Sequence, residues 1–373
     1  MKLFGIVSYN KYANFTNYGS ALQSWALNTI VNKLGEKYGW KAMFVDYCPD
    51  ILADKDPLNP FKNSWDQDEE SKRRIELSMP AIRVNYIKFM DFYDKRFNHT
   101  KKSYTSKNFN NIVINEHIDG FICGSDTIFC YKEFGFDDGY FANFECMRGH
   151  SVAYAPSFGD TNMDEIDKNR LSTLLNNFKY IGLREAEHLE FVKSCVNVPV
   201  KKVIDPTLLL DKDDYDTLVS KRFINDDYLL LYSRRNNPVM TNYADEIAKE
   251  KGLKVVDISL NVENHYKHIM CYDAGVEEFL SLVKDAKYVI TNSFHGMIMA
   301  VLFRKEFEIF SREQCDNKIE EVLQLFGLPE RMVTQGNVTL SKIDFDIVHA
   351  KIREARKEAL TVLKEELCNL IER

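Results

Sequence analysis

Residues 288–300 read YVITNSFHGMIMA: an apolar run of strand length, a short polar turn, and a second apolar segment. The first four residues are β-prone, and the last four continue as the buried face of a helix would. His295 lies in the turn, beside the predicted start of that helix. A histidine in this place is either a hydrogen-bonded core residue or a group that exchanges protons with a ligand near neutral pH.

The same order of strand, turn and helix recurs through most of the chain. Such alternation is typical of βαβ units that build a parallel sheet. Further strands are predicted at 3–8, 42–45, 120–123, 151–154, 180–183, 202–204, 228–232, 254–258 and 306–310. The chain of 373 residues is longer than one core normally organises, so we expect two domains.

The fold class predicted from this pattern is α/β, with two Rossmann-like domains. The first domain is expected over 1–210 and the second over 226–345, joined by the acidic run 211–216. A C-terminal helix is predicted over 346–373, where leucines recur as an apolar stripe.

Two features of the first domain concern its helices. Ser20 and Gln23 form a capping-box pattern, which predicts that a helix opens at Ser20. A polar insertion at about 50–74 contains two prolines and ends in a run of charges, so we expect a long excursion there. A helix with basic and aromatic residues is predicted to follow over about 81–97, either as a solvated surface helix or as a contact to a membrane-bound substrate.

Composition limits the kinds of function. The formal net charge of -7 argues against generic nucleic-acid binding, because no basic excess is present to release counterions. The first residues lack the pattern of a signal peptide, and no window has the ~20 apolar residues needed to span a bilayer. The 8 cysteines are scattered without a CxxC pair, which indicates free thiols in a reducing cytosol. We therefore expect a cytoplasmic protein.

One group of residues has metal-ligand chemistry. His265, His268 and Cys271 are spaced three apart, but no regular helix and no fourth ligand are evident around them. We interpret the segment as a polar loop and predict no metal site and no cofactor.

The candidate ligand site is expected where strands end. In open α/β sheets, ligands bind beyond the carboxyl ends of the strands. Polar or glycine-containing turns follow six predicted strands, at 17–20, 124–126, 157–159, 184–185, 233–236 and 292–296. Together they predict a cleft between the two domains.

Three arginines at these turns predict an anionic ligand. Arg184, Arg234 and Arg235 each follow a predicted strand, and the guanidinium fork suits phosphate and carboxylate groups. The alternative for Arg184 is an ion pair with Glu185 or Glu187. The alternative for Arg234 and Arg235 is a solvated loop.

Taken together, these motifs resemble the polysaccharide pyruvyl transferase family. The resemblance runs from the first strand to about Phe310 and rests on the order and spacing of Asn17-Tyr18-Gly19, Gly124-Ser125-Asp126, Tyr154-Ala155-Pro156-Ser157-Phe158-Gly159, Leu183-Arg184-Glu185, Asp205-Pro206-Thr207-Leu208-Leu209 and Thr291-Asn292-Ser293-Phe294-His295-Gly296. It implies a glycosyltransferase-B-like pair of domains. It also implies transfer of a pyruvyl group from phosphoenolpyruvate to a sugar, as a cyclic ketal, during assembly of a surface polysaccharide.

The reaction that the resemblance implies requires a proton-shuttling group and cations for the donor, and we assign these roles to particular residues. His295 would be the catalytic acid or base; Arg184, Arg234, Arg235 and Ser293 would bind the donor; Asn17, Gly19, Ser125 and Asp126 would bind the acceptor. Characterised members often have an arginine two residues before the histidine, where this chain has Ser293. The partners implied are phosphoenolpyruvate and a sugar or glycan, with a lipid-linked acceptor and contact with the inner membrane face as further candidates.

Two other functions remain open at this point. The first is a glycosyltransferase that uses a nucleotide sugar on the same scaffold, since fold does not fix function. Glu277 and Glu278, near the start of a predicted helix, are the candidate ribose-binding residues for it. The second is a non-catalytic member of a polysaccharide assembly complex.

Overall fold

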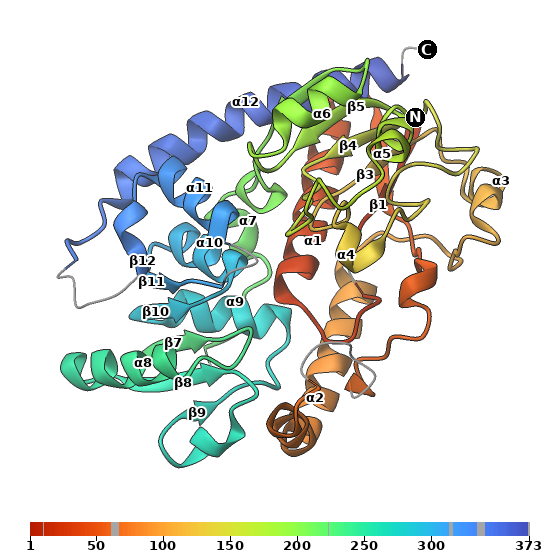
Figure 1. The fold of residues 1–373 in the computed structure, drawn as a ribbon. Helices are drawn as coiled ribbons and strands as arrows, with labels where there is room; N and C mark the ends of the chain where they lie inside the picture. Colours follow the sequence, from red (N-terminus) through yellow and green to blue (C-terminus); the bar gives the residue numbers. More distant parts are fainter. Residues whose placement is uncertain (10, 61–66, 223, 313–315, 334–339, 372–373) are drawn as a thin grey trace.

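A computed structural model describes residues 1–373 except 10, 61–66, 223, 313–315, 334–339 and 372–373 (Figure 1). The N-terminal half is built on a six-stranded sheet, all parallel, in the order β2-β1-β3-β4-β5-β6. Its strands are β1 Lys2–Val7, β2 Trp40–Phe44, β3 Gly120–Cys123, β4 Ser151–Tyr154, β5 Phe178–Leu183 and β6 Val200–Lys202. Strands β3 and β4 are buried along their whole length, as expected for a parallel sheet covered on both faces.

The C-terminal half repeats this plan. A second sheet of six parallel strands has the order β12-β11-β10-β7-β8-β9. Its strands are β7 Tyr228–Tyr232, β8 Lys254–Ile258, β9 Ile269–Met270, β10 Tyr288–Thr291, β11 Glu306–Phe310 and β12 Met332–Val333. The prediction of two Rossmann-like halves is confirmed, and the strands fall within the two predicted spans. The exact domain boundaries stay a prediction.

Helices cover both sheets. The α-helices are α1 Tyr18–Tyr38, α2 Glu69–Arg96, α3 Ile112–Glu116, α4 Tyr131–Phe134, α5 Lys168–Leu175, α6 Leu189–Cys195, α7 Lys212–Asp216, α8 Pro238–Lys251, α9 Val276–Asp285, α10 Phe294–Leu302, α11 Asp316–Phe326 and α12 Phe345–Ile371. The 3-10 turns are η1 Asp50–Leu52, η3 Phe109–Asn111, η4 Pro206–Leu208, η5 Val262–Tyr266 and η7 Pro329–Arg331. The acidic run predicted as a linker contains the short helix α7.

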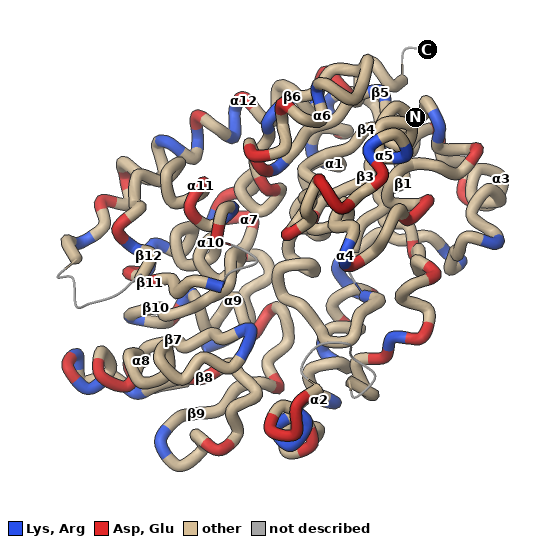
Figure 2. The backbone as a smooth tube through the Cα atoms, viewed as in Figure 1, with Lys and Arg blue, Asp and Glu red and all other residues tan. Residues whose placement is uncertain are grey.

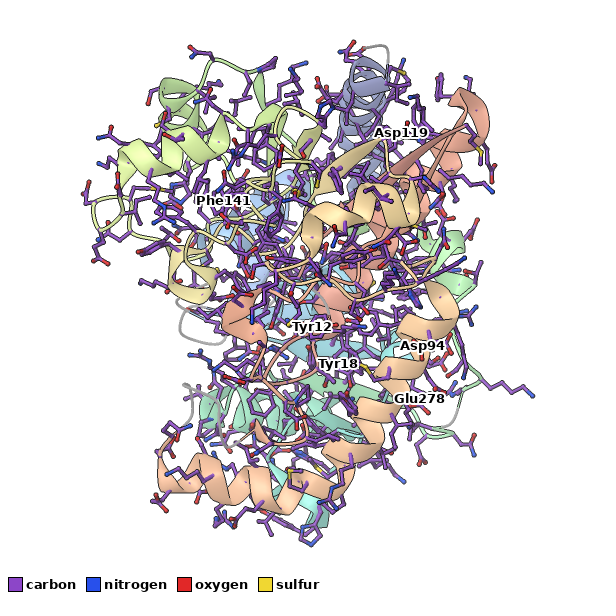
Figure 3. All side chains as sticks on the ribbon, turned by 90° about the vertical axis from the view of Figure 1, so that its right-hand side faces the viewer. Tyr12, Tyr18, Asp94, Asp119, Phe141 and Glu278 are labelled. Carbon is purple, nitrogen blue, oxygen red and sulfur yellow. The ribbon has the colours of Figure 1, made fainter. Side chains whose placement is uncertain are left out.

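Two long helices connect the halves. Helix α12 confirms the predicted C-terminal helix and runs back over the N-terminal half (Figure 1), where Arg356 donates to the carbonyl oxygen of Leu208. Helix α2 packs against the C-terminal half through an ion pair of 2.6 Å between Lys88 and Glu278. Figure 3 shows Glu278 beside α2, and acidic and basic residues alternate along α12 (Figure 2). These contacts hold the two sheets around a shared core.

The start of α2 was predicted too late. The helix begins at Glu69 rather than near Ala81, so the charge run forms its first turns. Arg73 pairs with Glu70 across one turn, an arrangement that stabilises a helix. Pro80 lies inside the helix, which bends along its length (Figure 3), as proline-containing helices do.

The start of α1 was also predicted wrongly. Asn17, not Ser20, is the N-cap, because its side-chain oxygen accepts from the backbone N–H groups of Gly19 and Ser20. The Ser20 hydroxyl donates instead to Asp126 at 2.5 Å. Helix α1 therefore presents its first turn to the space between the two sheets.

Candidate active site

A cavity of about 410 Å³ lies between the two halves, at the carboxyl ends of both sheets. Its volume is that of a small-molecule site. We call the part lined by residues before 210 the N-terminal wall and the part lined by residues after 228 the C-terminal wall. Turns that follow the strands form much of both walls, and helix α2 adds Ser71, Arg74, Ile75 and Asn85 to the lining.

Charge is divided unequally between the two walls. The lining contains 8 lysines and arginines against 3 carboxylates, although the whole chain is acidic. The N-terminal wall has Lys55, Arg74, Lys132 and Arg184 with Asp126, Glu133 and Asp160; the C-terminal wall has Arg234, Arg235, Arg312 and Lys318 with no carboxylate in its described part.

The cations of the N-terminal wall are largely neutralised. Arg74 pairs with Glu263 at 3.0 Å and Lys132 with Asp160 at 3.3 Å. By contrast, within the described residues neither Arg234 nor Lys318 has a carboxylate at ion-pair distance. An anionic ligand therefore finds its uncompensated positive charge on the C-terminal wall.

The turns after β7 and β10 are tied to each other. Thr291 and Tyr232 are register partners at the ends of these strands, and the Thr291 hydroxyl donates to the Tyr232 carbonyl at 2.7 Å. The Asn292 side chain accepts from the backbone N–H of Arg234 at 2.8 Å. Ser293 is the N-cap of α10, since its hydroxyl oxygen accepts from the backbone N–H of Gly296. The hydroxyl hydrogen of Ser293 is still available to a ligand.

His295 lies at the start of α10 and lines the cavity. Its Nε2 atom is buried, makes no hydrogen bond with the described residues, and lies 3.5 Å from Oδ2 of Asp205. Asp205 also accepts from Arg184 at 2.9 Å, and Arg184 pairs with Glu185 at 3.1 Å. Four ionisable groups from three distant segments thus form one buried cluster.

The cluster has a definite electrostatic bias. Burial raises the pKa of Asp205, but the neighbouring His295 and Arg184 outweigh it and hold that pKa well below its ordinary value. The attraction of Glu185 and Asp205 likewise holds the pKa of Arg184 above its ordinary value despite burial. Two carboxylates, Asp205 and Glu185, thus hold one guanidinium beside the His295 ring.

Gly19 brings α1 against this histidine. A Cβ atom at Gly19 would lie 2.2 Å from Nδ1 of His295, far inside van der Waals contact. The absence of a side chain therefore allows the first turn of α1 to pack directly on the imidazole ring. Gly19 does not itself line the cavity.

The predicted acceptor residues divide into lining and supporting groups. Asp126 lines the cavity with a left-handed φ of 69° and accepts from the Thr127 backbone at 2.9 Å. Ser125 is fully buried behind it, and its hydroxyl donates to Gln23 at 2.9 Å. Ser125 and Gly19 thus support the site from outside the cavity.

The cavity brings together most of the predicted site residues. Those that line it are Asn17, Asp126, Arg184, Arg234, Arg235, Ser293 and His295. Arg235 is exposed, whereas Arg184 is buried in the ion pairs that were its alternative interpretation.

Sequence reasoning missed several residues of the site. Asp205 was noted only as part of a motif, although it contacts both Arg184 and His295. Tyr232 was assigned only as the end of a strand, and Lys318 was not singled out. Lys318 lies in helix α11, which follows β11, and no local sequence pattern there indicates a ligand-binding residue.

The segment with metal-ligand residues has another structure. His268 is buried between two carboxylates, with Nδ1 at 2.8 Å from Asp257 and Nε2 at 2.7 Å from Asp245. His265 instead contacts a backbone carbonyl. In the part of the chain that the structure describes, no group of three histidine, cysteine or acidic side chains has the arrangement of a metal site. No described helix is long and apolar enough to cross a membrane.

This fold and site define a two-sheet α/β protein with a cationic cleft and a histidine at its centre. A sequence model described as polysaccharide pyruvyl transferase matches residues 17–313. The chain therefore belongs to the polysaccharide pyruvyl transferase family, a family of transferases that act on polysaccharides. No curated protein matches the sequence significantly.

Solved structures of similar fold come from other enzymes. A putative UDP-N-acetylglucosamine 2-epimerase from Listeria monocytogenes is 12% identical, with a TM-score of 0.49 over 97% of this chain and 91% of that one. The Neisseria meningitidis UDP-GlcNAc 2-epimerase bound to UDP-GlcNAc is 10% identical, with a TM-score of 0.48 over 99% and 100%. The E. coli ADP-heptose lps heptosyltransferase II is 12% identical, with a TM-score of 0.34 over 96% and 99%. The two parallel six-stranded sheets and the C-terminal helix are the features of the predicted fold class that the structure itself contains.

Proposed function

We propose that the protein transfers a pyruvyl group from phosphoenolpyruvate to two hydroxyl groups of a sugar, forming a cyclic ketal. The observation that carries this proposal is the division of charge in the cavity. A donor with a carboxylate and a phosphate on one small carbon frame requires several cations, and among the described residues Arg234 and Lys318 line the C-terminal wall with no carboxylate at ion-pair distance.

The reaction requires balanced proton movements. A sugar oxygen bonds to C2 of the donor while the methylene carbon C3 takes a proton and becomes a methyl group. The second sugar oxygen then bonds to C2 as the C2–O bond to phosphate breaks. In the overall balance, one of the two hydroxyl protons ends on C3, and the other leaves with the phosphate.

His295 is the proposed proton donor to C3. Oδ2 of Asp205 lies 3.5 Å from its Nε2 atom, so this buried carboxylate can orient the ring. After donating its proton, the neutral ring takes up the proton of the attacking hydroxyl. In this scheme Arg184 acts mainly through Asp205, while Arg234, Arg235 and the Ser293 hydroxyl bind the donor.

The N-terminal wall is the proposed acceptor site. Carboxylate oxygens of Asp126 and Glu133 line it and would accept hydrogen bonds from sugar hydroxyls. The side chain of Asn17 lies at the same edge but is used to cap α1. We place the reaction in the cytoplasm, where phosphoenolpyruvate is formed, with a lipid-linked acceptor at the membrane as one form of the substrate.

The test is a direct assay of transfer. The full chain is incubated with phosphoenolpyruvate and a panel of saccharides, and mass spectrometry detects the pyruvyl adduct while released phosphate is measured. We expect matched adduct and phosphate formation in the wild type and none in folded His295→Ala. A folded His295→Ala variant with full activity would remove this assignment.

The residues suggested for nucleotide-sugar binding have other partners. Glu277 pairs with Arg96, and Glu278 pairs with Lys88 and accepts from the Gly275 backbone. Neither glutamate lines the cavity. A thermal-shift comparison of nucleotide sugars with phosphoenolpyruvate separates the two donors, and we expect stabilisation by phosphoenolpyruvate.

A further inference from the structure

Three tyrosine hydroxyls surround Arg234 in the cavity. Tyr9 follows β1, Tyr232 ends β7 and Tyr272 follows β9, and all three line the cavity. Within the described residues, the Tyr232 hydroxyl makes no close hydrogen bond and interacts with the guanidinium of Arg234. Tyr232 is only 3% exposed, so this hydroxyl is a buried polar group. Buried polar groups without a close hydrogen bond are rare in native proteins and indicate a missing ligand or a functional role.

The ring of Tyr232 is held in a fixed place. It packs edge-on against Tyr18 at 5.6 Å and against Phe279 at 5.1 Å. A Cβ atom at Gly296 would lie 2.9 Å from the Tyr232 ring, so the glycine next to His295 leaves space for this ring. Ring packing therefore fixes the position of the hydroxyl, which is buried at the cavity wall.

Arg234 is held beside these hydroxyls by weak or backbone contacts only. Its backbone N–H donates to Asn292, and its guanidinium contacts the carbonyl oxygen of Thr16 at 3.5 Å. The hydroxyls of Tyr9, Tyr232 and Tyr272 are all close enough to interact electrostatically with the guanidinium. Burial raises the pKa of Tyr272 to about 12, so its hydroxyl remains a proton donor at neutral pH.

We propose that Arg234 and the hydroxyls of Tyr9, Tyr232 and Tyr272 form a subsite for one carboxylate group. A carboxylate carries one charge and has about four acceptor positions, which one guanidinium fork and phenolic donors can fill. A phosphate dianion requires more positive charge than this subsite has. This inference rests on the proposed function in one respect: it assigns the subsite to the carboxylate of the donor.

The order of the strands separates this subsite from the other cations. In the C-terminal sheet, β10 lies between β11 and β7, so His295 lies between the turn after β11 and the turn after β7. Arg312 and Lys318 follow β11, whereas Tyr232 and Arg234 belong to β7 and its turn. The phosphate is therefore assigned to the β11 side, and the reacting carbons of the donor to the space in front of His295.

The test measures binding of separate anions to the full chain. Pyruvate supplies a carboxylate without phosphate, inorganic phosphate supplies the other group, and methyl pyruvate lacks the charge. Ligand-observed NMR at millimolar concentrations gives affinities for the wild type, Tyr232→Phe and Tyr9→Phe/Tyr272→Phe. Tyr131→Phe is the matched control, because that exposed tyrosine does not line the cavity.

The expected result is weaker binding of the carboxylate ligand, with phosphate binding unchanged. Tyr232→Phe should weaken pyruvate binding about tenfold, the effect of one hydrogen bond to a charged group, and leave phosphate binding within about twofold. The Tyr131→Phe control should bind both anions as the wild type does, and methyl pyruvate should bind to none.

Other results overturn the assignment. An equal loss of pyruvate and phosphate binding in Tyr232→Phe, no loss of either, or no pyruvate binding by the wild type each refutes the subsite. The outcome is independent of transfer activity. If Tyr232 governs pyruvate binding while no ketal forms, the subsite stands and the proposed function fails; if ketal forms and Tyr232→Phe leaves the phosphoenolpyruvate KM unchanged, only the subsite fails.

Discussion

Replacing Gly19 with alanine tests the contact between α1 and the catalytic candidate. The new Cβ would lie 2.2 Å from Nδ1 and 2.8 Å from Cγ of His295. Non-bonded heavy atoms rest at about 3.5 Å or more, so the ring must move by more than about 1 Å. Its other nitrogen faces Asp205 at 3.5 Å, and α1 is anchored by the Asn17 cap, so the ring has to leave its present orientation.

Activity should then fall much more than stability. A displacement of about 1 Å of a catalytic group costs about a hundredfold in rate. Alanine inside a helix is favoured over glycine by about 1 kcal/mol, which offsets part of the steric cost. We therefore expect Gly19→Ala to fold normally by circular dichroism, with kcat for phosphate release reduced about a hundredfold.

A double-mutant cycle separates the steric contact from the helix effect. The free energy of unfolding in urea is measured for the wild type, Gly19→Ala, His295→Ala and the double variant. Without the imidazole ring, alanine at position 19 should stabilise the protein by up to about 1 kcal/mol; with the ring present it should not. Equal effects in the two backgrounds, or full activity of Gly19→Ala, would refute the contact.

Three further predictions concern charged residues. Asp205→Asn should lower the free energy of unfolding by about 3–5 kcal/mol, as loss of one partner of a buried pair does. Because the pKa of Asp205 is lowered on folding, its contribution to the free energy of unfolding is present above about pH 4 and is lost as the pH falls. The Tm of Asp205→Asn should therefore depend less on pH in the acid range than the Tm of the wild type does. Burial lowers the pKa of His268, but the two flanking aspartates outweigh it and raise that pKa. The contribution of His268 to the free energy of unfolding is therefore complete below about pH 6.5 and is lost as the pH rises. The Tm should fall between about pH 6.5 and about pH 9 in the wild type and should fall less in His268→Gln. Glu277→Gln and Glu278→Gln should each lower the free energy of unfolding by less than about 1 kcal/mol and leave the donor KM unchanged. A raised donor KM would instead support nucleotide-sugar binding.

Local patterns were enough to predict the sheets and the edge at which the site lies. The turn from Asn292 to Gly296 and the arginine after β7 both lie where strand-end reasoning put them. The errors have physical causes. Asn17 and Ser20 are both good N-caps, and the choice between them is made by Asp126, which is more than a hundred residues away and takes the Ser20 hydroxyl.

The missed residues depend on contacts that no local pattern contains. Asp205 precedes a proline and reads as a turn residue, yet its function in the structure comes from Arg184 and from His295, which is 90 residues further along the chain. Tyr232 reads as a strand residue because it ends the continuous apolar run YLLLY, which is typical of a strand buried on both faces. Only the assembled cavity shows that, among the described residues, its hydroxyl makes no close hydrogen bond.

The two walls of the cavity differ in what their cations can do. On the N-terminal wall, Arg74, Lys132 and Arg184 are held by carboxylates, so they shape the site but bring little net charge to a ligand. On the C-terminal wall, Arg234 and Lys318 repel each other until an anion arrives. A ligand with two anionic groups set apart on a short frame relieves that repulsion at both places, whereas a single anion relieves only one. The proposal of such a ligand therefore rests on the placement of charge, independently of the family to which the chain belongs.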